Sequence, residues 1–200
     1  LYFDVIPKAV DEYFTHLSKY SQLEEAQQID NVISHIHPDG VKGKLKESDS
    51  ISFALLLNLA AACNPESKDI LWGFISKYDD KLTASNAPVL DELAGYAVRY
   101  YDDFIKQHKN FRAATAKERD AILSLAKQLE NLSDAADAAE IQTLIYDIGK
   151  EYEFELRLWF QALYEILLGQ SQGPRMGSFI KLFGVKEMLS LINEKLSSKA

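Results

Sequence analysis

Apolar residues recur along most of this chain with the spacing of an amphipathic α-helix. One such stripe near the C-terminus comprises Val185, Met188, Leu189, Ile192 and Leu196. Intervals of one, three and four residues place its members on a single helical face. No segment alternates polar and apolar residues over several positions, as a half-buried strand would. The pattern therefore predicts an all-α protein, a helical bundle or cage of about ten helices. The expected helices span 5–20, 23–35, 52–63, 65–78, 87–107, 116–131, 138–153, 155–169, 175–183 and 185–198.

Capping residues and chain breakers mark several helix boundaries. Thr115-Ala-Lys-Glu118 and Asp137-Ala-Ala-Glu140 have the capping-box arrangement that begins a helix. Asn64-Pro65 is interpreted as an N-cap followed by proline at the first helical position. Gly184 is expected to end a short helix in a left-handed turn.

The polar segment from His35 to Ser50 contains one proline and two glycines, which predicts a loop or linker. His35 and His37 would share a face of an extended segment, and imidazole is a common metal ligand. No carboxylate or cysteine stands nearby at ligand-like spacing. A plain surface loop is therefore favoured over a metal site, and no metal is expected.

Composition excludes several classes of protein. The single cysteine, Cys63, rules out a disulfide framework within the chain. A net charge of −8 and an isoelectric point near 5.0 argue against a protein that coats DNA. No apolar run reaches about 18 residues, so no membrane span is expected. The first ten residues lack the pattern of a signal peptide and begin without methionine, which suggests a cytoplasmic protein cut from a longer chain.

The negative charge is not spread evenly. Residues 99–119 hold six basic and three acidic residues, and residues 171–200 hold five and two, so each segment carries +3. Because screening limits the reach of a charge to about 10 Å, local positive patches can hold phosphates on an anionic protein. Chance fluctuation is the competing interpretation of the same pattern.

No complete active site is visible in the sequence. It contains no glycine-rich phosphate loop, nucleophile elbow or metalloprotease pair. Cys63 ends an apolar helix and is expected to be a buried small hydrophobic residue. Trp159 and Phe160, in the strongly apolar helix Leu156–Leu168, are expected in the core.

The segment Gly169–Gly184 packs four glycines and a proline around Arg175, Ser178 and Lys181. Glycine lets a backbone approach another surface closely, and a helix N-terminus presents free N–H groups. The segment therefore suits a phosphate or nucleotide contact. A tight helix–helix turn with incidental charges explains it equally well.

The segment Arg99–Arg119 mixes cations with aromatic residues. Cations bind phosphates and aromatic faces stack on unpaired bases, so this mixture is typical of contacts to single-stranded nucleic acid. Tyr96, Tyr100 and Phe104 share one helical face and are expected in the core. The residues expected to be exposed for stacking are Tyr101, His108 and Phe111.

These segments, with others, resemble the C-terminal part of class I lysyl-tRNA synthetase. The resemblance runs in order over nearly the whole chain, and residues 21–50 and 120–136 match poorly. Its most specific stretch contains GQ-x-x-GPR-x-GSF. The matching stretches are LYFDVIPKAVDEY (1–13), SFALLLNLAAACN (52–64), DILWGFISKY (69–78), LDELAGYAVRYYDDF (90–104), KNFRA (109–113), EIQTLIYDIGK (140–150) and WFQALYEILLGQSQGPRMGSFIKLFGV (159–185).

The resemblance implies a helical anticodon-binding domain, similar in fold to that of glutamyl-tRNA synthetase, which binds the anticodon loop of lysine tRNA. It implies residues 1–50 as the tail of a stem-contact region plus linker, 51–108 as a first helical subdomain and 109–200 as a second. The family's two ATP-binding motifs are absent, so ATP with magnesium and lysine would be bound by a preceding catalytic domain. The fragment itself is expected to bind no cofactor and to be monomeric.

We hypothesise that the two basic segments converge on one lip of the helical cage and grip RNA there. Two alternatives remain, the equivalent domain of a glutamyl-type synthetase and a helical protein–protein adaptor. The candidate tRNA-binding residues are Arg99, Tyr101, Lys109, Phe111, Arg112, Gly173, Arg175, Ser178 and Lys181.

Overall fold

The computed structural model describes residues 3–133 and 135–197, and over these residues it has eleven α-helices and no strand. The all-α prediction is confirmed. The end of the last expected helix, Ser198, lies outside the described residues. The helices are α1 (Ile6–Ser21), α2 (Glu25–Gln28), α3 (Val32–Ile36), α4 (Phe53–Cys63), α5 (Lys68–Tyr78), α6 (Pro88–Tyr100), α7 (Ala116–Glu130), α8 (Ala138–Glu151), α9 (Leu156–Leu167), α10 (Met176–Phe183) and α11 (Val185–Ser197).

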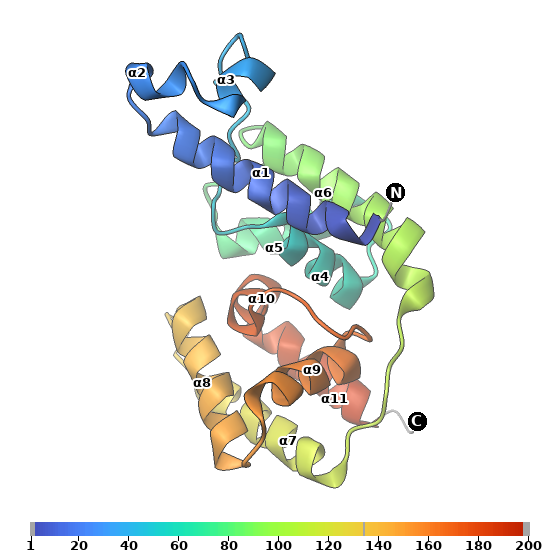
Figure 1. Cartoon of the computed structure of the whole chain (residues 1–200). Coiled ribbons are helices and arrows are strands. Elements are labelled where there is room, and N and C mark those ends of the chain that lie inside the picture. The colour runs from blue at the N-terminus through green and yellow to red at the C-terminus, as the bar shows by residue number, and fades with distance from the viewer. Residues whose placement is uncertain (1–2, 134, 198–200) are drawn as a thin grey trace.

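The helices form two lobes (Figure 1). The first lobe holds α1 to α6 and the second holds α7 to α11. After α6 the chain continues through a π-helical turn, Tyr101–Ile105, and a 3₁₀ turn, Lys106–His108. The connector, residues 109–115, then descends along one side of the molecule to α7. Helix α10 packs against α4 and α5, so it joins the second lobe to the first.

Helix α9 runs through the middle of the second lobe (Figure 1), as its apolar sequence predicts. Trp159 is fully buried, and its indole Nε1 donates to the Ile145 carbonyl at 3.0 Å. Phe160 is partly buried and meets Tyr146 edge to face. The core role expected for Trp159 is confirmed, because its one polar atom finds a partner inside the protein.

Both capping boxes form as predicted. The Thr115 hydroxyl accepts from the Glu118 N–H, and Asp137 does the same for Glu140. The interpretation of Asn64 is wrong. Asn64 is the left-handed C-cap of α4 (φ 46°, ψ 60°), and α5 begins four residues later, at Lys68. Asparagine tolerates this conformation, and the following proline marks a helix end.

In the first lobe, the N-termini of α4 and α6 are each held by a carboxylate from another segment of the chain. Asp11 of α1 accepts from the N–H groups of Phe53 and Ala54, at 2.6 and 3.1 Å. Glu47 accepts from the first free N–H groups of α6, both at 3.0 Å. Negative charge at a helix N-terminus is stabilising, so these contacts fasten α1 and the expected loop of residues 35–50 to the lobe.

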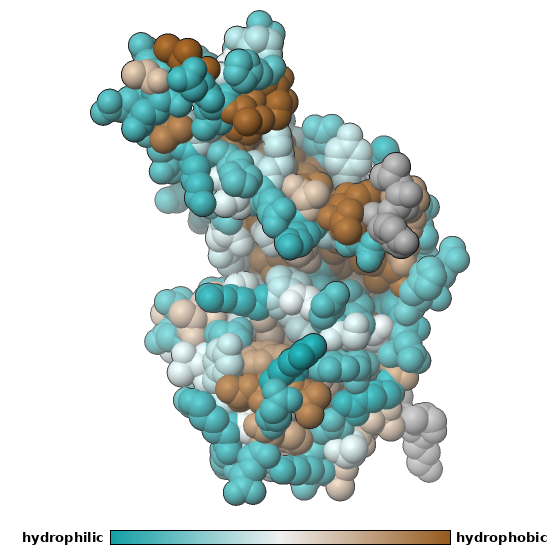
Figure 2. Space-filling model, viewed as in Figure 1, coloured by the Kyte–Doolittle hydropathy of each residue, from teal (hydrophilic) through white to brown (hydrophobic). Residues whose placement is uncertain are grey.

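The single helix expected over 23–35 is two short helices. Asn31 interrupts it and caps α3 by accepting from the Ile33 N–H at 3.0 Å. The pair α2–α3 leaves Ile29, Val32 and Ile36 exposed, and Figure 2 shows the apolar surface at this tip. Among the described helices, none is both long and apolar enough to cross a membrane.

Candidate nucleic-acid interface

A cavity of about 990 Å³ lies between the two lobes. Its walls come from α1, α4, the turns after α6, the connector and the loop Gly169–Pro174 that precedes α10. In Figure 1 this loop crosses the front of the second lobe below α4. Of the sequence-predicted residues, Arg112 and Gly173 line the cavity. The structure therefore brings one predicted site residue of each basic segment to the same cavity.

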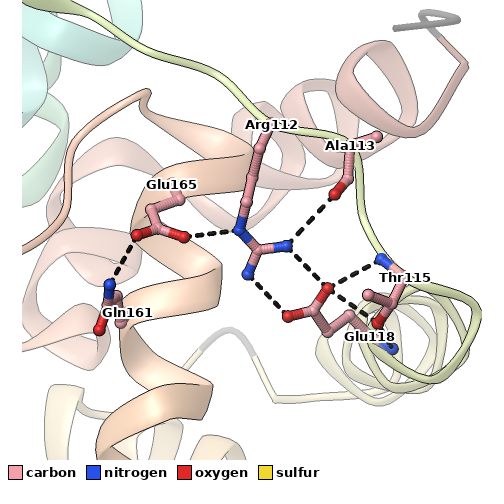
Figure 3. Close-up of polar contacts among 6 residues, drawn as sticks. All are labelled: Arg112, Ala113, Thr115, Glu118, Gln161 and Glu165. Carbon is pink, nitrogen blue, oxygen red and sulfur yellow. Dashed lines mark hydrogen bonds and ion pairs between the residues drawn. The ribbon is translucent and has the colours of Figure 1, made fainter.

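The guanidinium of Arg112 binds carboxylates of the second lobe (Figure 3). Its two terminal nitrogens meet Glu118 at 2.7 and 2.8 Å, and its Nε meets Glu165 at 2.5 Å. The paired Glu118 and then Glu165 raise the pKa of Arg112 above its ordinary value. This corrects the expectation of a phosphate-gripping rim residue, because bidentate geometry commits the planar guanidinium to protein carboxylates.

Glu118 combines this ion pair with the start of α7. Its carboxylate also accepts from the Thr115 N–H at 2.8 Å and from the Thr115 hydroxyl at 2.9 Å. Arg112 first, and then the bonds from Thr115, lower the pKa of Glu118 to about 2 despite its burial. The network ties the connector to α7 and α9, so it fixes the course of the chain beside the cavity.

The two basic segments meet at Phe111. The Asn110 N–H donates to the Gly169 carbonyl at 2.8 Å, and the Phe111 ring packs on Gly169, which has a φ of +69°. A side chain at Gly169 would be strained and would press on this ring. The Nζ of Lys195, on α11, lies 4.4 Å from the centroid of the Phe111 ring, and the Nζ of Lys109 lies 5.3 Å from it. Phe111 itself is 42% exposed, as predicted.

Lys109 also binds the end of α4. Its Nζ donates to the Ala61 carbonyl at 2.6 Å and to Asn64 Oδ1 at 3.2 Å. Burial, and secondarily the nearby Lys195, lower the pKa of Lys109. Sequence reasoning missed Lys195, and its only signal was a place in the last turn of a helix within the basic C-terminal segment.

Tyr101 is fully buried, which contradicts its predicted role as an exposed stacking residue. Its hydroxyl donates to Asn64 Oδ1. Tyr101 follows Ala97 by four residues and continues the buried face of α6 into the π-helical turn. The predicted core positions Tyr96 and Phe104 are 48% and 36% exposed, which contradicts the prediction for them. Tyr100 is partly buried against the core and His108 is exposed, as predicted.

Arg99 stands apart from the cavity. Its exposed guanidinium lies 5.9 Å from the Tyr96 ring centroid, beside a separate hollow that Lys68 and Asp91 also line. Arg175 is exposed at the residue before α10, and Ser178 is half-buried in the first turn.

A backbone N–H in the first turn of α10 already has a hydrogen-bond partner inside the protein. The Gly177 N–H donates to Gln142 Oε1 at 2.8 Å, so α8 occupies a donor that was expected to face RNA. Lys181, farther along α10, is half-buried and takes part in the contacts of the folded protein. Convergence of the basic segments therefore centres on Lys109, Phe111 and Lys195.

The loop before α10 packs on side chains of α4 and α9. A Cβ at Gly173 would overlap the Tyr164 ring and the Asn58 amide, so only glycine fits there. The Tyr164 hydroxyl donates to the Pro174 carbonyl, and burial raises the pKa of Tyr164. The glycines of this segment thus permit close packing of the loop on α4 and α9.

The other singled-out groups have structural partners. His37 Nε2 lies 2.7 Å from the Tyr13 hydroxyl, and its Nδ1 lies 3.2 Å from Lys44 Nζ. The described part of the chain holds no group of three or more potential metal-ligating side chains. Cys63 is partly buried, and burial raises the pKa of its thiol to about 11, so it is a poor nucleophile.

Comparisons with known proteins agree with this architecture. A family model described as the anticodon binding domain matches residues 76–196, more than half of the chain. The chain is 48% identical over 201 residues to a lysine–tRNA ligase of Rickettsia felis, 49% over 199 residues to that of Rickettsia akari and 48% over 198 residues to that of Rickettsia bellii. These alignments cover 98–100% of this chain and 37–38% of each relative, so the chain spans little more than a third of their length. The matched region runs from the end of α5 almost to the end of α11 and contains the Phe111 junction. The chain belongs to the anticodon-binding domain family.

Proposed function

We propose that this chain is the C-terminal, anticodon-binding region of a class I lysine–tRNA ligase and that it holds the anticodon loop of lysine tRNA. The observation that carries the proposal is near-50% identity to lysine–tRNA ligases along the whole chain. ATP with magnesium and lysine would then bind to the part of the ligase that lies outside this chain. The parent protein would be a cytoplasmic monomer.

The geometry supports an RNA loop at the junction of the lobes. Proteins recognise single-stranded RNA by splaying out bases, stacking them on aromatic side chains and contacting phosphates with cations. The ring of the exposed Phe111 lies near the Nζ atoms of both Lys109 and Lys195, and residues of the same connector line the interlobe cavity. The acidic remainder of the surface would discourage non-specific RNA binding.

We further propose that the boundary between two helical subdomains falls at the start of the connector, with 51–108 before it and 109–200 after it. Residues 1–50 would be the tail of the stem-contact region. In this arrangement Phe111, Arg175 and Lys195 belong to the second subdomain. RNA bound at the junction would touch both subdomains.

Titration of the chain with lysine tRNA and with a lysine tRNA carrying a changed anticodon tests the proposal. We expect the unchanged tRNA to bind more tightly at moderate salt, and Phe111→Ala to weaken binding with little effect on the melting temperature. Phe160→Leu, away from the junction, serves as the control for an aromatic replacement. Equal affinity for both tRNAs would contradict anticodon recognition.

The same titration with glutamate tRNA separates the proposal from a glutamyl-type synthetase. Preference for glutamate tRNA would favour that alternative. A protein adaptor is favoured by one observation, the exposed Ile29, Val32 and Ile36 on α2–α3. If neither tRNA binds at low salt, a protein adaptor becomes the better account of the function of this chain.

A further inference from the structure

The tip of the first lobe, which comprises residues 22–40 with α2 and α3, presents three large apolar side chains to solvent. Ile29, Val32 and Ile36 are 69%, 68% and 55% exposed. Val32 and Ile36 stand four residues apart on α3 and so share a face, and Figure 2 shows the apolar surface at this tip. Removing side chains of this size from water is favourable, so the face is suited to a partner.

The backbone that carries this face is held in place by the tip's own packing. The buried residues Leu17, Tyr20 and Ile33 form a small cluster separate from the main core. The Tyr13 hydroxyl lies 2.7 Å from Nε2 of His37, the residue that ends α3. Because α3 is fixed from the inside, a partner that covers its outer face pays little entropy for ordering the tip.

The charges around the face restrict what can cover it. Residues 22–40 contain no lysine or arginine and four acidic residues, all exposed, which are Glu24, Glu25, Asp30 and Asp39. Lys42 and Lys44 follow in the next loop, so residues 22–45 still carry −2. Negative charge repels a phosphate backbone or an anionic lipid surface, and two copies meeting through this face would bring like charges together. The complementary occupant is a protein segment that sets lysine or arginine beside apolar residues.

We propose that the tip docks a basic amphipathic helix of another protein, in addition to the RNA contact proposed at the junction of the lobes. No residue of α2 or α3, both fully described, lines the interlobe cavity, so the two partners can bind together. The 3₁₀ turn Phe3–Val5 lies at the opposite end of α1, about 24 Å away, and α11 belongs to the second lobe (Figure 1). This placement favours another protein over a further part of the same polypeptide.

The test titrates the chain with a synthetic basic helical peptide that has leucines along one face and lysines elsewhere. A peptide of the same composition, with its leucines scattered around the helix, is the control ligand. At physiological salt the first peptide should bind the wild-type chain about tenfold more tightly than the second. The triple variant Ile29→Ser, Val32→Ser and Ile36→Ser should lose this preference. The variant Leu123→Ser with Leu158→Ser, at exposed apolar positions of α7 and α9, should keep it.

A second variant tests the charges while the apolar face stays intact, and it also serves if the triple variant folds poorly. Glu25→Gln with Asp30→Asn should weaken binding of the first peptide about fivefold and make it less sensitive to salt. Asp120→Asn with Glu130→Gln, at exposed positions of α7, makes the same charge change and should leave the affinity as it is.

Equal affinity of the wild-type chain for both peptides, or an unchanged preference in the triple variant, would overturn the inference. Three other results would overturn it by naming a different occupant. A wild-type dimer that the triple variant does not form would assign the face to a second copy. Weaker binding of lysine tRNA by the folded triple variant would assign it to RNA, and slow amide exchange at residues 29–36 in the full-length ligase alone would assign it to the same polypeptide. Failure of the wild type to bind tRNA would defeat the proposed function and leave this inference standing.

Discussion

The guanidinium of Arg112 makes its ion pairs inside the protein although it belongs to a basic segment. Glu118, which is only 9% exposed, accepts hydrogen bonds from two nitrogens of this guanidinium. The same carboxylate also accepts from the Thr115 N–H at the start of α7. A buried carboxylate with several donors stays ionised far below its ordinary pKa. Part of the pH dependence of the stability of the fold should therefore come from this side chain.

We expect the free energy of unfolding to fall as the pH drops from about 5 to about 2. The folded-state pKa of Glu118 is about 2, against an ordinary value of 4.5, so the unfolded chain takes up the proton first. The contribution is complete above the ordinary pKa and is lost toward the folded pKa. Because Arg112 is 37% exposed, we discount the full shift to about 2 kcal/mol.

Urea unfolding of the wild type and of Glu118→Gln between pH 7 and pH 2.5 measures this effect. The variant should be less stable at pH 7, and the difference should narrow as the pH falls. Glu130→Gln, on an exposed position of the same helix, should follow the wild type. Parallel curves for the wild type and Glu118→Gln would show that Arg112 does not stabilise the carboxylate.

At the scale of elements, α8 and α10 approach each other closely at a glycine. A Cβ at Gly177 would overlap the Ala138 carbonyl oxygen and the backbone of Gln142. At Gly73, in the middle of α5, a Cβ would meet nothing within 4 Å. Packing therefore requires glycine at position 177, whereas it leaves room for a side chain at position 73.

Gly177→Ala should destabilise the protein by about 1–3 kcal/mol, because backbone atoms must move apart. Gly73→Ala should stabilise it by about 0.5–1 kcal/mol, since alanine is the better helix former. Thermal unfolding of the two variants gives the comparison. Similar melting temperatures for both would mean that α8 and α10 are not in tight contact.

Helix positions were predictable where the determining residues are local. The boxes at Thr115 and Asp137 specify the starts of α7 and α8 within four residues of sequence, and both were found. Asn64 was misassigned because its residue type suits an N-cap and a left-handed C-cap equally. Tyr101 was misassigned because apolar residues occur on both faces of this segment, and only packing against α4 decides between them.

The candidate site was predictable only in part. Spacing and charge identified Phe111 and the loop with Gly173, which the structure brings to the lobe junction. The partners of Arg112, six and fifty-three residues away, depend on how α7 and α9 pack.

At the scale of the whole molecule, the account depends on where RNA lies relative to the two lobes. The connector and α10 hold the lobes together, and the cavity between them is walled by the loop Gly169–Pro174. Ser171, in this loop, is exposed and faces solvent at the cavity. A probe at this position reports directly whether an anticodon loop occupies the junction.

The most direct measurement is photo-crosslinking of lysine tRNA from a single cysteine placed at Ser171, in a chain that also carries Cys63→Ala. The account predicts crosslinks to unpaired nucleotides of the anticodon loop. Ser85→Cys, exposed and outside the cavity wall, should give none. Crosslinks from Ser171→Cys that fall only in the acceptor stem, or that match those from Ser85→Cys, would contradict binding of the anticodon loop between the lobes.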